Sequence, residues 1–82
     1  MAMHYVYILR SKAYPAQTYV GFTADIDARL VKHNEGGCPH TAKFRPWCLE
    51  WHCVFPDKGK ALAFEAYLKS HSGKAFTNKR LI

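Results

Sequence analysis

The alternation of apolar and polar positions near the start of the chain predicts two strands. Residues 4–10 alternate and are rich in aromatic and β-branched side chains, which is typical of a strand whose successive side chains point to opposite faces. Residues 10–17 indicate a loop, and residues 18–22 predict the second strand of an antiparallel hairpin. Gly21 lies inside that strand, where a glycine is costly unless another group must approach the backbone closely.

A helical pattern follows the hairpin. Thr23 is a good N-cap, and the two aspartates after it suit the positive end of a helix that runs to about His33. The inward stripe of this helix is expected to consist of Ile26, Leu30 and His33. Arg29 lies on the edge of the same face, where a guanidinium is costly to bury unless an anion meets it.

The second half of the chain predicts a third strand and a second long helix. Residues 35–46 are expected to form a loop, and residues 47–55 a strand with enough apolar side chains on both faces to be largely covered. A helix is predicted from about residue 60 to residue 70, followed by a short helix or turn over residues 74–80. The core-facing side chains of the long helix are expected to be Ala61, Phe64, Tyr67 and Leu68.

These elements predict an α+β fold in the order β-β-α-β-α with a short C-terminal helix. Helices would flank a small three-stranded antiparallel sheet. The chain has 82 residues, of which 49% are hydrophobic and 15% aromatic. This length and composition exclude a disordered chain and provide for one core, so residues 1–82 are expected to form a single domain.

The formal net charge of +6 is concentrated towards the end of the sequence. Residues 1–57 contain six Lys and Arg against five Asp and Glu, whereas residues 58–82 contain six Lys and Arg against Glu65 alone. A basic segment of this kind attracts polyanions such as nucleic acid. The same charges are equally compatible with a surface that is only solvated.

The cysteines and the hydropathy give further expectations. Cys38, Cys48 and Cys53 contain no CxxC pair; with His40 and His52 they could form a zinc site, although the spacing matches no standard zinc motif. No secretory signal and no apolar stretch long enough to span a membrane is seen. The sequence therefore predicts a cytoplasmic protein with reduced thiols and no membrane association.

Two tyrosines, an arginine and a histidine are candidates for chemistry. Tyr7 and Tyr19 lie on neighbouring predicted strands and could share one face of the sheet, although tyrosines in strands more often serve in packing. A phenol is a poor base near neutral pH, but a nearby cation or a bound metal favours the phenolate. Arg29 could meet a phosphate or extend its head into water. His33, one turn further on, could orient that phosphate or pack in the core.

Glu65 is the single acid of residues 58–82. One interpretation is an i,i+4 ion pair with Lys69, which contributes only about a few tenths of a kcal/mol. The other makes Glu65 the protein ligand of one Mg²⁺ or Mn²⁺ ion, whose remaining positions are filled by water and phosphate oxygens. A two-metal site needs several clustered carboxylates, and no other acid of the chain lies in a suitable context, so a one-ion site is favoured.

Two short motifs, Tyr5-Val6-Tyr7-Ile8-Leu9 and Tyr19-Val20-Gly21, are followed by Arg29 and, much later, by Glu65. This order extends over nearly the whole chain and resembles that of the GIY-YIG nuclease superfamily. The stretch over residues 63–69 also looks like the closing segment of the family. The resemblance implies a divalent-metal-dependent endonuclease that hydrolyses phosphodiester bonds in DNA, with RNA left open.

The resemblance also implies roles for individual residues. Glu65 would bind one Mg²⁺ or Mn²⁺ ion, and Arg29 would meet the charge that develops on the phosphate. Tyr19 would position or deprotonate the attacking water with help from Tyr7. We expect these residues to converge on one concave surface, with His33 at its margin. Sequence specificity should be low unless a protein partner that targets the enzyme, or an unusual DNA shape, supplies it, and the setting would be repair or recombination.

The sequence departs from the family pattern in two places. Tyr5 stands where the name-giving glycine of the first motif would be, and Phe22 stands where some relatives have a lysine directly after the second motif. A phosphate contact by that lysine would have to be replaced, for which Lys43 is a candidate. The basic residues expected to line the path of the nucleic acid are Lys43, Arg45, Lys69, Lys74 and Arg80.

A nucleic-acid-binding module without catalysis is the competing hypothesis. The basic end of the chain and exposed aromatic side chains would account for binding without any metal. Both hypotheses predict salt-sensitive binding, so only metal-dependent cleavage separates them.

Overall fold

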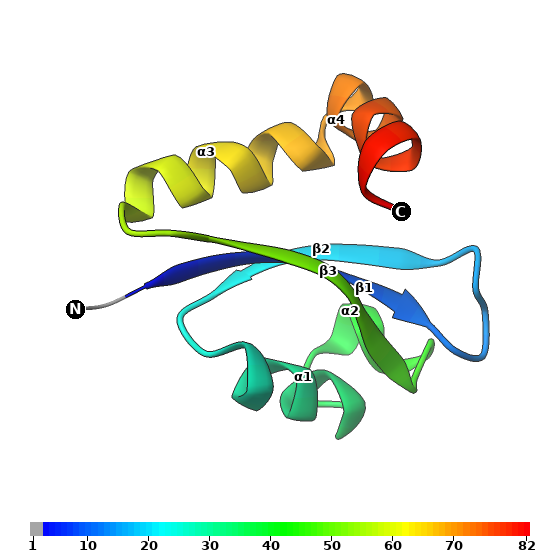
Figure 1. The fold of residues 1–82 in the computed structure, drawn as a ribbon. Helices are drawn as coiled ribbons and strands as arrows, with labels where there is room; N and C mark the ends of the chain where they lie inside the picture. The colour runs from blue at the N-terminus through cyan, green and yellow to red at the C-terminus, as the bar shows by residue number, and fades with distance from the viewer. Residues whose placement is uncertain (1–2) are drawn as a thin grey trace.

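The computed structural model of the protein describes residues 3–82 and contains one antiparallel sheet with helices on both faces (Figure 1). Its strands are β1 (His4–Ser11), β2 (Thr18–Thr23) and β3 (Trp47–Phe55), in the spatial order β2-β1-β3. Both neighbours pair antiparallel to β1, which is therefore the central strand. The predicted α+β class and the order of the elements are confirmed.

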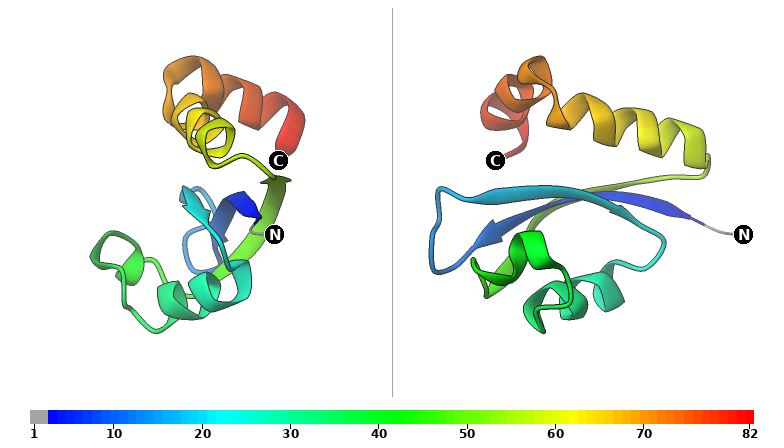
Figure 2. Two further views of the ribbon diagram at one scale, coloured as in Figure 1. Left: turned by 90° about the vertical axis from the view of Figure 1, so that its left-hand side faces the viewer. Right: turned by 180° about the vertical axis from the view of Figure 1, so that it is seen from behind.

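The helices form two layers, one on each face of the sheet (Figures 1 and 2). One layer consists of α3 (Lys58–Lys69) and α4 (His71–Phe76), continued by the helical turn η1 (Thr77–Leu81). The other consists of α1 (Ile26–Asn34) and the short α2 (Pro39–Ala42). The sheet lies between the layers, so residues of the central strand β1 are buried on both of its faces.

Alternation along β1 divides the core into two clusters. Val6 and Ile8 are fully buried on the face turned to α3, where they pack with Ala61 and Leu68. Tyr7 belongs to the other cluster, together with Leu9 and Trp47, on the face turned to α1. The predicted alternation is confirmed, and it places Tyr7 on the α1 side of the sheet.

The start of α1 differs from the prediction. Thr23 was expected as the N-cap, but it is the last residue of β2 and pairs with Tyr5 across the sheet. Its hydroxyl instead accepts a hydrogen bond from the backbone N–H of Asp25. The Asp25 carboxylate then caps the helix by accepting from the N–H of Ala28 at 3.1 Å. Strand pairing thus continues to Thr23 and moves the cap by two residues.

The segment expected to be a loop over residues 35–46 contains α2. This helix is only four residues long, with Pro39 in its first turn, and is too short to produce a periodic hydrophobic pattern. A residue of β3 holds this helix in place, because the indole N–H of Trp47 donates to the carbonyl of Thr41 at 2.9 Å. The side chain of Asn34 also bonds to both backbone groups of Trp47, which ties the end of α1 to β3.

Two predictions about burial were wrong. β3 was expected to be largely covered on both faces, but it is an edge strand: Trp51 packs in the α3 cluster, while His52 and Val54 on the other face are exposed. Tyr67 was expected to face the core, yet 42% of it is exposed. Its ring packs against Phe64 at the edge of the core instead, at a centroid distance of 6.2 Å.

Candidate active site

The ring of Tyr7 lies directly over Gly21. The two residues are paired across β1 and β2, and a Cβ atom at position 21 would overlap Cζ and Oη of Tyr7 and come within 2.9 Å of Cε1. Only glycine therefore leaves room for the phenol at this place. The close approach that the sequence suggested for Gly21 is found, and the approaching group is the first candidate tyrosine.

Tyr7 is the start of a buried chain of hydrogen bonds. Its hydroxyl lies 3.0 Å from Nε2 of His33, and Nδ1 of the same imidazole lies 2.8 Å from Oγ1 of Thr41. Tyr7, His33 and Thr41 are all 2% exposed or less. The Thr41 hydroxyl is also 3.2 Å from the carbonyl oxygen of Cys38, which can only accept.

These contacts favour one tautomer of His33. A hydroxyl has one proton, and in the arrangement in which Thr41 donates it to the Cys38 carbonyl, Thr41 accepts from the Nδ1–H of His33. Nε2 then carries a lone pair and accepts the proton of the Tyr7 hydroxyl. Burial lowers the pKa of the His33 imidazole, and the charges of Arg29 and Lys32 lower it further. His33 is therefore neutral at neutral pH and acts as an acceptor for Tyr7.

Tyr19 and Arg29 complete the cluster. The Tyr19 ring packs 5.0 Å from the imidazole of His33 and 6.4 Å from the ring of Tyr7, measured between centroids. The Arg29 guanidinium interacts with the Tyr7 hydroxyl, and its Nε atom is buried without a hydrogen-bond partner among the described residues. A donor of this kind is costly to bury unless an anion meets it.

The environment of Tyr7 has opposing effects on its acidity. Burial raises the pKa of the Tyr7 hydroxyl, and the neighbouring Arg29 guanidinium opposes this rise. The net result is a pKa above the ordinary value of 10.0, so Tyr7 holds its proton at neutral pH. An additional cation near the ring would be needed to favour the phenolate.

Glu65 reaches this region from the opposite layer. It lies on α3, and its carboxylate forms an ion pair with Lys69 at 3.4 Å, the pair named as one interpretation of the sequence. The ammonium of Lys69 lies 5.8 Å from the centroid of the Tyr19 ring. Only 19% of the Glu65 side chain is exposed. Lys69 thus links Glu65 to Tyr19 around the edge strand β2.

Four of the five candidate catalytic residues lie in direct contact with one another, and the fifth does not. Tyr7, Tyr19, Arg29 and His33 form one cluster between the sheet and α1. Glu65 is connected to it through Lys69. His33 was expected at the margin of the cleft, but it is 0% exposed and contacts Tyr7 instead of the surface, because α2 closes over it.

The basic residues expected on the nucleic-acid path also divide into groups. Lys69 and Lys74 line one cleft, together with Arg10, which the sequence analysis did not single out. The other three lie outside that lining: Lys43, Arg45 and Arg80. Within residues 3–82 no three His, Cys, Asp or Glu side chains are grouped to hold a metal ion, so the cysteines and histidines considered for zinc do not form a cluster.

Thr41 is the member of the site that the sequence analysis missed. It lies in the segment expected to be a loop. The sequence offers one indication of its role, namely that Thr41 is a β-branched polar residue two positions after Pro39. Its contact with His33 joins residues eight positions apart and depends on the placement of α2. No local pattern reports such a contact.

We expect Thr41→Val to change the state of His33. Valine keeps the shape of threonine but cannot accept from the buried Nδ1–H, which should lower the free energy of unfolding by about 1–3 kcal/mol. Imidazole ¹⁵N shifts should report a proton on Nδ1 in the parent protein and a mixture of tautomers in the variant. Thr41→Ser, which keeps the hydroxyl, should behave like the parent. Identical ¹⁵N shifts in all three proteins would contradict this role of Thr41.

The fold and this cluster together define a small α+β domain with two tyrosines, a histidine and an arginine grouped beside its sheet. Residues 3–80 match the family model described as the GIY-YIG catalytic domain, and the chain belongs to this family. It is 37% identical over 73 residues to a UPF0213 protein of Staphylococcus haemolyticus, covering 88% of this chain and 87% of that one. It is also 42% identical over 73 residues to the structure-specific endonuclease subunit SLX1 of Debaryomyces hansenii, covering 78% of this chain and 20% of that one.

A solved structure has the same fold. The solution NMR structure of a UPF0213 protein from Bacillus halodurans matches with a TM-score of 0.57 and 34% identity, covering 96% of this chain and 86% of that one. Across residues 3–82, none of the helices has the length and apolar character that crossing a membrane requires.

Proposed function

We propose that the protein is a divalent-metal-dependent endonuclease that hydrolyses phosphodiester bonds in DNA. The observation that carries this proposal is the half-buried Arg29 side chain, whose buried Nε has no hydrogen-bond partner among the described residues and whose guanidinium lies beside Tyr7, in a cluster with Tyr19 and His33. A preorganised donor of this kind is most useful where negative charge develops on a phosphate. A purely structural arginine would have its hydrogen bonds satisfied.

In this proposal the tyrosines handle the attacking water. Tyr19 is half-buried and orients the water, while Tyr7 is buried against α1 and takes part through its hydrogen bond to His33. As the attacking water gives a proton to the Tyr7 hydroxyl, the proton that Tyr7 already holds can pass to Nε2 of His33, because that nitrogen carries the lone pair. Burial and the neighbouring cations lower the pKa of His33, which favours release of the proton after the reaction.

A single metal ion fits the residues that are present. The Glu65 carboxylate is a hard oxygen donor, is partly accessible, and already holds the ammonium of Lys69 at 3.4 Å. A divalent ion at Glu65 would displace that ammonium and take its other ligands from water and phosphate. When bound, the ion supplies Lewis-acid stabilisation of a phosphate oxygen and of the leaving 3′ oxygen.

The second candidate function, nucleic-acid binding without catalysis, is favoured by one observation. Glu65 is fully accounted for by its ion pair with Lys69, so the pair requires no metal. In either case DNA is the proposed partner. Because the relative in Debaryomyces hansenii is named a structure-specific endonuclease subunit, we include branched DNA among the proposed substrates and repair as the proposed setting.

Incubation of the purified protein with labelled single-stranded, duplex and branched DNA tests the proposal. We expect cleavage with Mg²⁺ or Mn²⁺, none with chelator, and faster cleavage of branched than of linear duplex DNA. Salt-sensitive binding to all three substrates without any metal-dependent cleavage would overturn the endonuclease proposal and favour the binding module.

A further inference from the structure

A second feature of the molecule is a cleft on the face of the sheet opposite to α1. The cleft has a volume of about 500 Å³ and lies between the β1–β2 hairpin and the C-terminal helices. Its apolar floor includes Ile8, Val20 and Leu68 from β1, β2 and α3. Polar side chains from the hairpin loop and η1 complete the lining. A cavity of this size with an apolar floor and a polar rim is typical of a small-ligand site.

The charged residues of the cleft are all cationic. Arg10, Lys69 and Lys74 line it, and no Asp or Glu does. Two of these cations are held by carboxylates from outside the lining: Glu50 lies 3.4 Å from Arg10, and Glu65 lies 3.4 Å from Lys69. Lys74 forms no ion pair within residues 3–82. The cleft therefore suits an anion of low charge, such as one phosphodiester or phosphate group.

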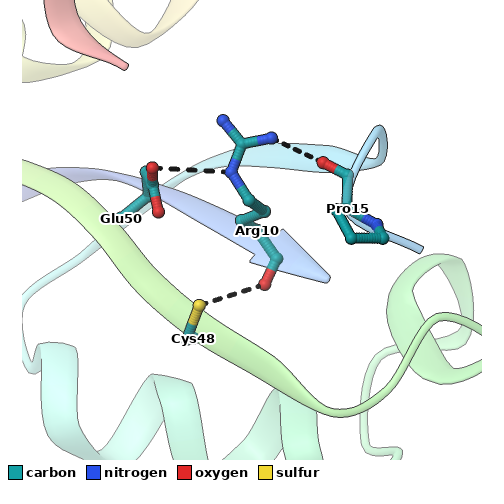
Figure 3. A network of polar contacts seen from close by, with 4 residues as sticks. All are labelled: Arg10, Pro15, Cys48 and Glu50. Atoms are coloured by element: carbon teal, nitrogen blue, oxygen red, sulfur yellow. Dashed lines mark hydrogen bonds and ion pairs between the residues drawn. The ribbon is translucent and has the colours of Figure 1, made fainter. Parts of the chain in front are cut away.

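Arg10 is fixed in position before any ligand arrives. Its Nε pairs with the Glu50 carboxylate, and its Nη1 donates to the carbonyl of Pro15 in the hairpin loop. Figure 3 shows the guanidinium between these partners, with no dashed line to its remaining nitrogen. That nitrogen provides donors in a fixed position, which reduces the entropy lost on binding an anion.

Thr77 is a buried polar residue of the cleft whose side chain has no hydrogen-bond partner among the described residues. It is 7% exposed, and its Oγ1 atom has no hydrogen-bond partner in the described part of the chain. It begins η1, where the N–H of Ile82 bonds to the Thr77 carbonyl five residues earlier, a spacing that occurs often at functional sites. A buried hydroxyl without a partner is unfavourable, and a polar ligand in the cleft would satisfy it.

The cleft is continuous with the candidate active site at the edge of β2. Tyr19 and Lys69 both line it, and the Lys69 ammonium lies 5.8 Å from the Tyr19 ring centroid. Tyr19 also packs against His33 on the other side. A nucleic-acid strand with one phosphate at Arg29 could therefore pass around the β2 edge and place its neighbouring nucleotide in the cleft.

We propose that this cleft is a nucleotide-binding subsite that holds one nucleotide of the substrate strand next to the scissile phosphate. Arg10 and Lys74 bind its phosphate, the sugar and base lie on the apolar floor, and the Thr77 hydroxyl gains a hydrogen-bond partner. The inference rests on the proposed function, because the occupant belongs to the substrate strand.

Metal-free binding tests the subsite apart from cleavage. Thymidine 5′-monophosphate and a short oligothymidylate are titrated separately into the ¹⁵N-labelled protein, followed by backbone amide shifts. We expect both probes to shift the amides of Gln17, Thr77 and Asn78, and the oligothymidylate to bind more tightly. Thr77→Val should weaken binding about three- to tenfold, the effect of one hydrogen bond, without lowering the melting temperature. Lys74→Ala should make the salt dependence shallower by about one phosphate contact.

Lys79→Ala is the matched control, because Lys79 lies on the same helical turn as Thr77 but outside the cleft lining. It should leave both affinity and the amide shifts as in the parent. Amide shifts confined to other surfaces, or equal affinities for the parent, Thr77→Val and Lys74→Ala proteins, would overturn the subsite. If the parent binds as expected but cleaves no DNA, the endonuclease proposal fails and the nucleotide site stands.

Discussion

Glu65→Gln should reduce the rate of metal-dependent DNA cleavage by more than about a hundredfold. Glutamine keeps the size of the side chain but lacks the charge that a hard divalent cation requires, and the stabilisation lost with such an ion is of the order of several kcal/mol. DNA affinity without metal should stay the same or rise slightly, because a negative charge leaves a phosphate-binding surface. Cleavage rates and metal-free dissociation constants, measured on one substrate, check this result.

The stability of the Glu65→Gln protein should be nearly unchanged. The Glu65–Lys69 pair is partly exposed, and its loss should cost at most about half a kcal/mol, so that lost cleavage cannot be attributed to unfolding. Glu35→Gln is the matched control, because Glu35 is an exposed acid at the end of α1 and should retain full activity. A Glu65→Gln protein that cleaves as fast as the parent would show that Glu65 does not hold the metal.

Arg29→Ala should also abolish cleavage, with a loss of about a hundred- to a thousandfold and some loss of affinity. The guanidinium is the preorganised cation beside Tyr7, and removal of one such donor from a transition-state site has an effect of this order. The pKa of His33 should rise at the same time, because the Arg29 charge lowers it in the parent protein. Single-turnover cleavage and an NMR titration of the His33 imidazole measure both effects.

Lys32→Ala separates the two consequences of removing Arg29. The charge of Lys32 also lowers the pKa of His33, so this variant should raise that pKa in the same direction. Lys32 is exposed and outside the cluster, and its removal should leave cleavage intact. If Lys32→Ala loses as much activity as Arg29→Ala, the arginine acts through the charge state of His33 and not on the phosphate.

The positions of the strands and the facing of β1 could be predicted because both depend on local alternation, whereas the exposed face of β3 follows from its place at the edge of the sheet. Residues 4–10 show the alternation of a buried strand. A glycine inside the second strand indicates that some group lies close to the backbone there, and that group is the ring of Tyr7. The grouping of Tyr7 with Tyr19 follows from antiparallel pairing of adjacent segments, in which Leu9 faces Tyr19 and Tyr7 faces Gly21. Such contacts are encoded by sequence spacing and strand geometry alone.

Other parts of the site depend on contacts between distant segments. His33 is buried because α2 covers it. The four residues of α2 are too few to show a helical pattern in the sequence, and the helix is held in place by a hydrogen bond from Trp47 of β3. The link from Glu65 to Tyr19 depends on how α3 lies across the sheet, which places Lys69 at the edge of β2. The cleft at Arg10 and Thr77 likewise combines both ends of the chain.

The metal-dependent cleavage rate of a matched set of variants tests the central claim most directly. Labelled branched DNA is incubated with the parent, with Tyr7→Phe, Tyr19→Phe, Arg29→Ala and Glu65→Gln, and with the controls Tyr14→Phe, Lys32→Ala and Glu35→Gln, all purified in parallel. The account predicts that the parent and controls cleave with Mg²⁺ and stop with chelator, while each variant of the cluster or of Glu65 loses most of its activity. Equal rates across the whole set would indicate a contaminating nuclease, and either that result or an inactive parent would contradict the claim.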